Sequence, residues 1–408
     1  MVYINILYFC QLYPPAIYGG GEYIFFQWAK ELVRRGHRVF TVTQRLDGTQ
    51  DYEIVDGIDV YRVGPSVAYE GILSVNIRDN VGYILEATVK GMLLLSRNYI
   101  DLIHSNTYSP IIPGCICSTM FHKPHVVTFH DVYLLGRTKF WKEWTQQPSI
   151  PRLTAFLGPI FERFALMLSG NSIIHTVSET SKHDLVSCNV KAPIVVISNA
   201  VDMEKFDTPK GDIQNHPQAI YIGRLVFYKN LETVFEAFRQ LRRTFPETKL
   251  IIVGDGPFRE HLQKLAENLN DRIVFTGRVS EEEKLSLLKQ SSFLVLPSLV
   301  EGFGIVILEA FACQKPALVS NIPPLSEIVE DGVDGFTIPP FESDLWAHKM
   351  LHLFMNPQLA HEMGLKGHEK LKRSYTIKRV ADKLEEFYKS IISGRVHGKF
   401  EVDLRRHH

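Results

Sequence analysis

Short runs of β-branched and aliphatic residues alternate with amphipathic helical runs along most of this chain. A strand-like run at residues 3–9 is followed by a helical run at 22–35 and by a second strand-like run at 38–43. In the helical run, apolar residues recur at spacings of three and four, which favours an amphipathic helix. This order is typical of βαβ units, whose strands lie parallel in one sheet. The sequence therefore predicts an α/β fold.

The alternation forms two long series, separated by a polar segment with proline and glycine at 208–217. A chain of 408 residues is also too long for one hydrophobic core. We therefore predict two doubly wound, Rossmann-like domains, at 1–205 and 206–375, and a C-terminal helix at 376–400. Such sheets bind ligands at the carboxyl ends of their strands, so we expect the two domains to face a ligand-binding cleft.

Each series has a definite order of expected elements. In the first series a helix is expected over 80–96, and the strands are expected at 3–9, 38–43, 57–63, 101–104, 125–129, 172–177 and 193–197. In the second series the strands are expected at 219–223, 249–253, 272–276, 292–296 and 316–319, and the helices at 230–245, 257–269, 281–290 and 304–313.

Composition excludes several classes of protein. Lysine plus arginine and aspartate plus glutamate both number 45, and this balance argues against a dedicated nucleic-acid binder. Five cysteines do not make a disulfide framework, and Cys115 and Cys117 lack a second pair to complete a zinc site. The chain shows no signal-peptide pattern and no apolar run of about 18 residues. We expect a cytoplasmic protein with reduced thiols and no transmembrane helix.

The segment 301–309 places two carboxylates around a glycine turn, between a strand-like run and a helix-like run. The free amides of a helix N-terminus suit a phosphate, whereas a carboxylate accepts hydrogen bonds from sugar hydroxyls. Glu301 and Glu309 are about 12 Å apart if all the intervening residues are helical. The segment favours a nucleotide-sugar site, and the alternative is a buried helix with one incidental glutamate.

Two more turns follow expected strands. Gly223 and Arg224 leave one strand and Lys229 opens the next helix, so two cations could clamp a diphosphate there. The alternative is a solvated basic loop. Gly254 and Gly256 form a second turn, which is a weak signal alone because glycine follows strands in most α/β folds.

Taken in order, these motifs carry a resemblance to a known family. Gly223-Arg-Leu, Lys229-Asn, Val253-Gly-Asp-Gly-Pro and Glu301-Gly-Phe-Gly with Glu309 resemble the donor domain of retaining GT-B glycosyltransferases. More narrowly, they are similar to glycosyltransferase family four, also called glycosyl transferases group 1. The resemblance covers most of residues 219–345 and extends more loosely over the N-terminal half.

The resemblance implies a role for each matching residue. Arg224 and Lys229 would hold the diphosphate, Glu301 the donor sugar and Glu309 the ribose, while His130 would abut the sugar. The implied catalytic set is Arg224, Lys229, Glu301 and His130. The implied donor-binding set is Gly20, Gly21, Gly223, Gly254, Val279, Phe303, Gly304, Ile305 and Glu309.

The implied reaction moves a sugar, with retention, from a UDP- or GDP-sugar to a hydroxyl of a glycan, a lipid-linked acceptor or a small molecule. Cations would stabilise the charge that develops on the leaving diphosphate. The chain has no Asp-x-Asp pair, so we expect neither a metal nor another cofactor. The rival hypotheses are a nucleotide-sugar epimerase or hydrolase on the same fold and a non-catalytic nucleotide-binding subunit.

Two further segments leave alternatives open. Basic and aromatic residues mix over 137–164, which suits either a peripheral contact with the inner membrane face or an ordinary loop and helix. His122, His125 and His130 could suggest a metal site, but strand alternation puts His125 and His130 on opposite faces. We interpret His104 as a hydrogen-bonded histidine at the edge of the cleft.

Overall fold

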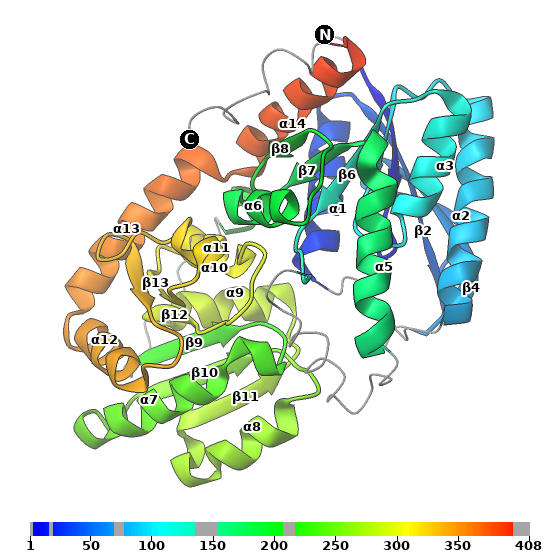
Figure 1. Cartoon of the computed structure of the whole chain (residues 1–408). Coiled ribbons are helices and arrows are strands. Elements are labelled where there is room, and N and C mark those ends of the chain that lie inside the picture. Colours follow the sequence, from blue (N-terminus) through cyan, green and yellow to red (C-terminus); the bar gives the residue numbers. More distant parts are fainter. Residues whose placement is uncertain (1–2, 16–18, 69–76, 135–153, 207–216, 395–408) are drawn as a thin grey trace. The chain divides into compact units, whose positions relative to one another are not determined.

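The computed structural model describes residues 3–15, 19–68, 77–134, 154–206 and 217–394. Its described residues form two units (Figure 1): unit 1 contains those up to Asn199 and again from Ile377, and unit 2 those from Ala200 to Thr376. The boundary between the two units thus lies before residue 205, the last residue predicted for the first domain. Val201 explains this, because its amide donates to the Tyr375 carbonyl at 3.1 Å within unit 2. Residues 208–216 of the predicted linker lie outside the described residues.

Unit 1 is built on one sheet in the order β3-β4-β2-β1-β5-β6-β7-β8. Its strands are β1 (Asn5–Phe9), β2 (Arg38–Leu46), β3 (Tyr52–Val55), β4 (Ile58–Val67), β5 (Leu102–Ser105), β6 (His125–Phe129), β7 (Ile173–Thr176) and β8 (Ile194–Val196). All neighbouring pairs are parallel except β3 and β4, which form a hairpin. The edge strand β3 was not predicted, although Asp56 and Gly57 both have positive φ, the conformation that an Asp-Gly hairpin turn requires.

The helices of unit 1 are α1 (Gly20–Arg34), α2 (Ile77–Arg97), α3 (Ile111–Phe121), α5 (Thr154–Leu168), α6 (Glu179–Ser187) and α14 (Ile377–Ile392). The predicted apolar face of α1 is fully buried and consists of Ile24, Phe25, Trp28, Ala29 and Leu32. The last helix, α14, packs against α1 (Figure 1). Arg35, just after α1, donates to Asp382 at 2.7 Å and to Glu385 at 3.2 Å, so ion pairs reinforce this packing.

A buried chain of hydrogen bonds joins α14 to the unit 1 sheet. The Tyr388 hydroxyl lies 3.0 Å from that of Tyr8 and 2.6 Å from His104 Nδ1. His104 Nε2 meets Thr128 Oγ1 at 2.6 Å, and Thr128 meets His175 Nδ1 at 2.8 Å. Burial lowers the pKa of His104 well below its usual range and that of His175 to about 4. Both rings are therefore neutral and hydrogen-bonded, as buried polar groups must be.

Unit 2 has a six-stranded parallel sheet in the order β11-β10-β9-β12-β13-β14. The strands are β9 (Gln218–Ile222), β10 (Lys249–Val253), β11 (Ile273–Gly277), β12 (Phe293–Leu296), β13 (Ala317–Ser320) and β14 (Gly335–Ile338). The helices are α7 (Leu231–Thr244), α8 (Arg259–Ala266), α9 (Glu281–Gln290), α10 (Ile305–Ala312), α11 (Pro323–Ser326), α12 (Ser343–Met355) and α13 (Pro357–Ser374).

The strand order of unit 2, counted from β9, is the 3-2-1-4-5-6 order of doubly wound folds. The predicted α/β class with two doubly wound sheets is thus confirmed, and among the strands described only the β3–β4 pair of unit 1 is antiparallel. The chain runs outward in opposite directions from β9 and β12, and we call this place the switch point of unit 2. In unit 1 the corresponding switch point lies between β1 and β5.

The buried histidines of unit 1 predict an acid-sensitive fold. Burial lowers the pKa of His125 and His130 to about 3, whereas an unfolded chain has a histidine pKa of about 6.5. The unfolded state therefore gains protons first, so this stability is fully present above about pH 6.5 and is lost as the pH falls toward 3. The free energy of unfolding, measured in urea, should fall by up to about 1.4 kcal/mol for each such histidine and each unit of decreasing pH.

The His125→Asn variant should have a shallower pH dependence than the wild type between pH 6.5 and 4.5. The exposed His361 of unit 2 provides the control, because His361→Gln should leave the slope unchanged. Equal slopes for wild type and His125→Asn would contradict this account.

Candidate active site

The loops that follow β11, β10, β9 and β12 come to one edge of the unit 2 sheet, because parallel strands have their carboxyl ends on the same side. Val279 follows β11, Gly254 follows β10, Arg224 and Lys229 follow β9, and Glu301 follows β12. The sequence-predicted residues of the second half therefore share one edge. The charged residues among them, Arg224, Lys229 and Glu301, flank the switch point, where doubly wound sheets bind their ligands.

An ion pair crosses this switch point. Lys229 Nζ contacts Glu301 Oε1, which also accepts a hydrogen bond from Ser298 Oγ at 2.8 Å. Arg224 donates to the Tyr228 hydroxyl at 2.9 Å, and Lys229 Nζ lies 5.4 Å from the centre of the Tyr228 ring. The predicted residues Arg224, Lys229 and Glu301 thus gather with Tyr228 and Ser298, which were not predicted. One ligand at this edge could meet both a carboxylate and a cation.

Close backbone packing explains the glycines of this edge. A Cβ on Gly254 would lie 2.0 Å from the Gly223 carbonyl oxygen, and one on Gly256 would lie 2.3 Å from the Leu225 carbonyl oxygen. Gly254 also has a φ of 130°, a conformation that side chains disfavour. The loops after β9 and β10 therefore pack main chain against main chain, which leaves room for a ligand to approach the backbone.

The helix α10 begins directly behind the Glu301 loop. Its N-cap, Gly304, has a φ of 91°, and the buried Phe303 ring packs 6.1 Å from that of Tyr375. Among the described residues, none accepts a hydrogen bond from the amides of Phe303 and Gly304. Amides at the start of a helix attract anions, so this turn suits a phosphate.

Glu309 lies on α10 and is largely buried. Its Oε1 is 2.9 Å from Nζ of Lys284 on α9, and Lys284 also pairs with Glu281 at 2.9 Å. Burial lowers the pKa of Lys284, but the two glutamates outweigh burial and raise it above its usual range. Sequence reasoning missed Lys284. Because α10 begins only at Ile305, the spacing from Glu301 to Glu309 is helical over its second half and not throughout.

Unit 1 has its own cluster at the carboxyl edge of its sheet. His130 follows β6, Asn106 follows β5, and the glycines 20 and 21 open α1. A Cβ on Gly21 would lie 2.9 Å from His130 Cδ2, so the histidine ring rests against the glycine turn. His130 Nε2 is 3.0 Å from Asn106 Oδ1. The predicted glycine turn and histidine are thus neighbours, next to an asparagine that was not predicted.

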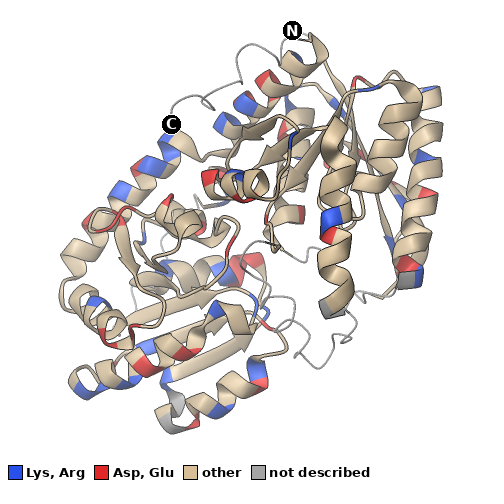
Figure 2. Cartoon of the chain, in the orientation of Figure 1, with Lys and Arg blue, Asp and Glu red and all other residues tan. Residues whose placement is uncertain are grey.

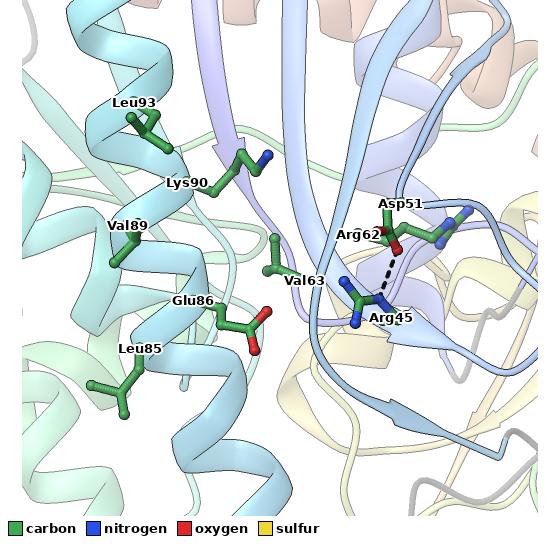
Figure 3. A pocket seen from close by; sticks show the side chains of 9 residues that line it. All are labelled: Arg45, Asp51, Arg62, Val63, Leu85, Glu86, Val89, Lys90 and Leu93. Carbon is green, nitrogen blue, oxygen red and sulfur yellow. Dashed lines mark ion pairs between the residues drawn. The ribbon is translucent and has the colours of Figure 1, made fainter.

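A cavity of about 340 Å³ lies elsewhere in unit 1, between α2 and the strands β2 and β4 (Figure 3). Its lining residues are Arg45, Asp51, Arg62, Val63, Leu85, Glu86, Val89, Lys90 and Leu93. Its charges already have partners: Arg45 pairs with Asp51 at 2.9 Å, and Glu86 accepts from the Gly64 amide at 2.8 Å. None of the sequence-predicted site residues lines this cavity, which we therefore set apart from the candidate site.

The three histidines weighed as metal ligands have different surroundings. His122 caps the end of α3, His125 bonds to Ser105 and Ser172 at 2.8 Å each, and His130 bonds to Asn106. Within the described ranges, no group of three or more histidine, cysteine, aspartate or glutamate residues is arranged to hold a metal. In the same ranges, no helix combines the length and hydropathy that crossing a membrane requires.

Comparison with known proteins agrees with this geometry. The family model "Glycosyltransferase Family 4" matches residues 18–205, and "Glycosyl transferases group 1" matches residues 202–370. These two matches together span most of both units. The chain belongs to this family of GT-B glycosyltransferases.

Relatives and solved structures show the same relationship. Alpha-D-kanosaminyltransferase of Streptomyces kanamyceticus is 32% identical over 44% of this chain and 47% of its own length, so the match spans about half of that relative. N-acetyl-alpha-D-glucosaminyl L-malate synthase of Bacillus anthracis is 24% identical over 95% of this chain and 97% of its own.

Two solved structures confirm the GT-B fold. Sucrose-phosphate synthase of Thermosynechococcus elongatus has a TM-score of 0.78 at 19% identity, covering 96% of this chain and all (100%) of the other. HepE of Anabaena, solved in complex with UDP-glucose, has a TM-score of 0.72 at 20% identity. The match covers 95% of this chain and 100% of the HepE chain.

The close packing of the two glycine turns predicts a large cost for Gly254→Ala. The new Cβ would collide with a carbonyl oxygen in addition to straining φ. The free energy of unfolding, measured in urea, should therefore fall by at least about 3 kcal/mol. Gly332→Ala is the matched control, because Gly332 also has a positive φ, 74°, but a Cβ added there would have no described heavy atom within 4 Å. This control should lose about 1–2 kcal/mol, the cost of φ strain alone. Equal losses would contradict the packing argument.

Proposed function

We propose that this protein is a retaining glycosyltransferase that uses a nucleotide diphosphate sugar and requires no metal. The observation that carries the proposal is the Lys229–Glu301 pair at the switch point of unit 2, beside Arg224 and the start of α10. Between UDP- and GDP-sugars we favour UDP, because HepE was solved with UDP-glucose. The acceptor in our proposal is a hydroxyl of a glycan, a lipid-linked molecule or a small molecule.

In the proposed reaction, Arg224 and Lys229 bind the diphosphate together with the amides of Phe303 and Gly304. These groups are positioned before the reaction, so they stabilise the charge that develops when the sugar–phosphate bond breaks. Arginine offers a fork of donors and lysine a compact charge, which suits the adjacent phosphates. Tyr228 holds the Arg224 guanidinium by the hydrogen bond described above.

In this proposal the two glutamates bind two other parts of the donor, the transferred sugar and the ribose. Glu301, on the strand-end loop, accepts hydrogen bonds from hydroxyls of the transferred sugar, while Glu309, on α10, accepts them from the ribose. Gly254 and Val279 present backbone to the base. Lys284 holds the Glu309 carboxylate in place through an ion pair, since its ammonium group lies 2.9 Å from Glu309 Oε1. Ile305 contributes as the first helical residue behind the phosphates.

Unit 1 contributes the glycine turn of Gly20 and Gly21 and the imidazole of His130 to the same reaction. In a retaining transfer the acceptor hydroxyl attacks the face from which the diphosphate leaves, and its proton passes to the departing phosphate. His130 is neutral, because burial lowers its pKa to about 3, so it can accept a hydrogen bond without repelling a cation. We assign it to the sugar rather than to proton transfer.

The main rival is a nucleotide-sugar epimerase or hydrolase on the same fold. Such an enzyme converts the donor without an acceptor, so product analysis with the donor alone separates the two. A non-catalytic nucleotide-binding subunit would bind the donor and release no nucleotide diphosphate with any acceptor. The gathering of Arg224, Lys229 and Glu301 at one edge favours an active transferase over that subunit.

We place the enzyme in the cytoplasm and at the inner face of the membrane. All five cysteines are free thiols, which suits a reducing compartment. The helix α5, the described part of the basic and aromatic segment, is the feature that suggests membrane contact. Its exposed side chains Phe156, Ile160, Phe164 and Met167 recur at helical spacing along one face.

The membrane assignment rests on the high exposure of this apolar face and on the scarcity of charge along α5. Phe156 and Met167 are 68% and 69% exposed, and Figure 2 shows α5 almost without charge except for a band near its middle. The exposed Arg163 adds one cation to the helix. Apolar side chains beside a basic residue suit the interface of an anionic membrane. Residues 137–153 of the segment lie outside the described residues.

Nucleotide binding tests the donor assignment. The melting temperature should be measured with UDP, GDP and their sugars. The nucleotide that the site binds should raise it, and should add about 2.7 kcal/mol to the free energy of unfolding at one hundred times its dissociation constant. Glu309→Gln should weaken UDP binding roughly tenfold or more, since a charged hydrogen bond contributes about 1.5–3 kcal/mol. Glu301→Gln should leave UDP binding intact and lower kcat/KM for the UDP-sugar.

The control for these variants is Glu281→Gln, which removes the exposed partner of Lys284 and should change neither quantity. If no nucleotide or nucleotide-sugar shifts the melt, the donor site proposed for unit 2 is wrong.

Vesicle sedimentation tests the α5 contact. The wild type should bind vesicles of anionic lipid at low salt, and Phe156→Ser with Phe164→Ser should weaken binding by roughly tenfold or more, because each buried aromatic contributes about 1.5–3 kcal/mol. Leu85→Ser with Val89→Ser removes comparably exposed apolar side chains from α2 and should have no effect. The same loss in both double variants would contradict a specific role for α5.

A further inference from the structure

Five residues of unit 1 form a directional chain of hydrogen bonds across its switch point. Cys10 Sγ donates to the Leu12 carbonyl at 3.0 Å, and Asn106 Nδ2 donates to Cys10 Sγ at 3.5 Å. Asn106 Oδ1 accepts from the Thr107 amide at 2.9 Å and lies 3.0 Å from His130 Nε2. The chain joins the loops after β1 and β5 to His130, the residue that follows β6.

The two ends of this chain fix its direction. A carbonyl oxygen such as that of Leu12 can only accept, so the Cys10 thiol must donate to it and can accept from Asn106 Nδ2. The Thr107 amide can only donate, so the atom of Asn106 that faces it must be the carbonyl oxygen Oδ1. Both ends therefore require the same orientation of the Asn106 amide. Burial raises the pKa of Cys10 to about 12, which keeps the thiol protonated as this direction demands.

The orientation of Asn106 decides which nitrogen of His130 carries the proton. Oδ1 has no hydrogen to give, so the bond at 3.0 Å exists only if His130 Nε2 donates. A neutral imidazole has one N–H group, and the other nitrogen is then an acceptor. Nδ1 of His130 has no hydrogen-bond partner among the described residues.

We propose that Asn106 is a positioning residue that holds His130 as the Nε2–H tautomer and so presents Nδ1 as an acceptor for a hydroxyl of the transferred sugar. This inference rests on the proposed function, in which His130 meets the sugar. The opposite tautomer would present an N–H group at the same place, and a sugar hydroxyl could then meet it only as an acceptor. Asn106 thus determines the polarity of this contact.

The surroundings of the ring support a fixed orientation. Gly21 leaves room for His130 where any side chain would come within 2.9 Å of the ring, and Phe25 packs against it with centroids 6.2 Å apart. Ser181 Oγ donates to the His130 carbonyl at 3.2 Å, which anchors the main chain. The ring is held on its faces by packing, and its protonation is determined by Asn106.

The first experiment is nuclear magnetic resonance of the full chain with ¹⁵N-labelled histidine, without ligand. The signals of His130 are identified by their absence in His130→Gln. The wild type should show a protonated Nε2 and an unprotonated Nδ1, as should Cys10→Ala, which keeps the Thr107 amide bond to Oδ1. An Nδ1–H tautomer or an imidazolium in the wild type at pH 7.5 would overturn the proposal.

Two variants of Asn106 separate tautomer control from simple packing. Asn106→Leu removes the acceptor, so His130 should lose its single tautomer, and kcat/KM for the UDP-sugar should fall roughly tenfold. Affinity for UDP, which lacks the sugar, should remain at the wild-type value. Asn106→Asp keeps an acceptor but places a carboxylate beside the ring, which raises the pKa of His130.

For Asn106→Asp, protonation of His130 removes the Nδ1 acceptor, so kcat/KM should fall with decreasing pH at a higher apparent pKa than in the wild type. Equal pH profiles for the two proteins, or an unchanged tautomer in Asn106→Leu, would overturn the proposal. The proposed function fails in a distinguishable way: the Nε2–H tautomer would be observed, but no nucleotide-sugar would bind or react.

Discussion

The carboxyl edge of the unit 2 sheet brings opposite charges together at one place, and the candidate site depends on this. Lys229 comes from the loop after β9 and Glu301 from the loop after β12, and the two strands are neighbours at the switch point. An ion pair with little exposure to water is stable only with further hydrogen bonds, such as the one from Ser298. In the proposed function, the groups that bind the diphosphate and the sugar are thereby adjacent.

Unit 1 uses the same topology with a different chemistry. Its edge carries no comparable ion pair among the residues given to the reaction; it carries a neutral histidine, an asparagine and a glycine turn instead. Burial favours the neutral imidazole, and the directional chain from Leu12 to Asn106 determines its proton. In the proposed reaction, unit 2 therefore binds the diphosphate with charged groups, and unit 1 meets the transferred sugar with an uncharged one.

Much of this could be predicted from the sequence because it depends on local patterns. Alternation predicted every strand except β3 and β14 to within a few residues. The strand β3 was missed because it is a short edge strand with partly exposed residues. The helix expected over 257–269 is shorter, since α8 ends at Ala266 and a 3-10 turn follows.

The partners of the site residues could not be predicted in the same way. Lys284 reaches Glu309 because α9 and α10 lie near each other in the fold, and no spacing along the chain shows that. Asn106 and His130 are likewise joined only by the adjacency of β5 and β6. Tyr228 is different: it stands next to Lys229 in the sequence, and an aromatic residue there could have been included.

The central claim is that a nucleotide-sugar binds at the carboxyl edge of the unit 2 sheet. Hydrogen–deuterium exchange with and without UDP-glucose, UDP-N-acetylglucosamine and their GDP-linked counterparts tests it most directly, because bound ligand protects the amides it contacts. The account predicts protection in three segments: 223–230, 254–257 and 301–309. Protection confined to other parts of the chain, or none with any of these ligands at saturating concentration, would contradict it.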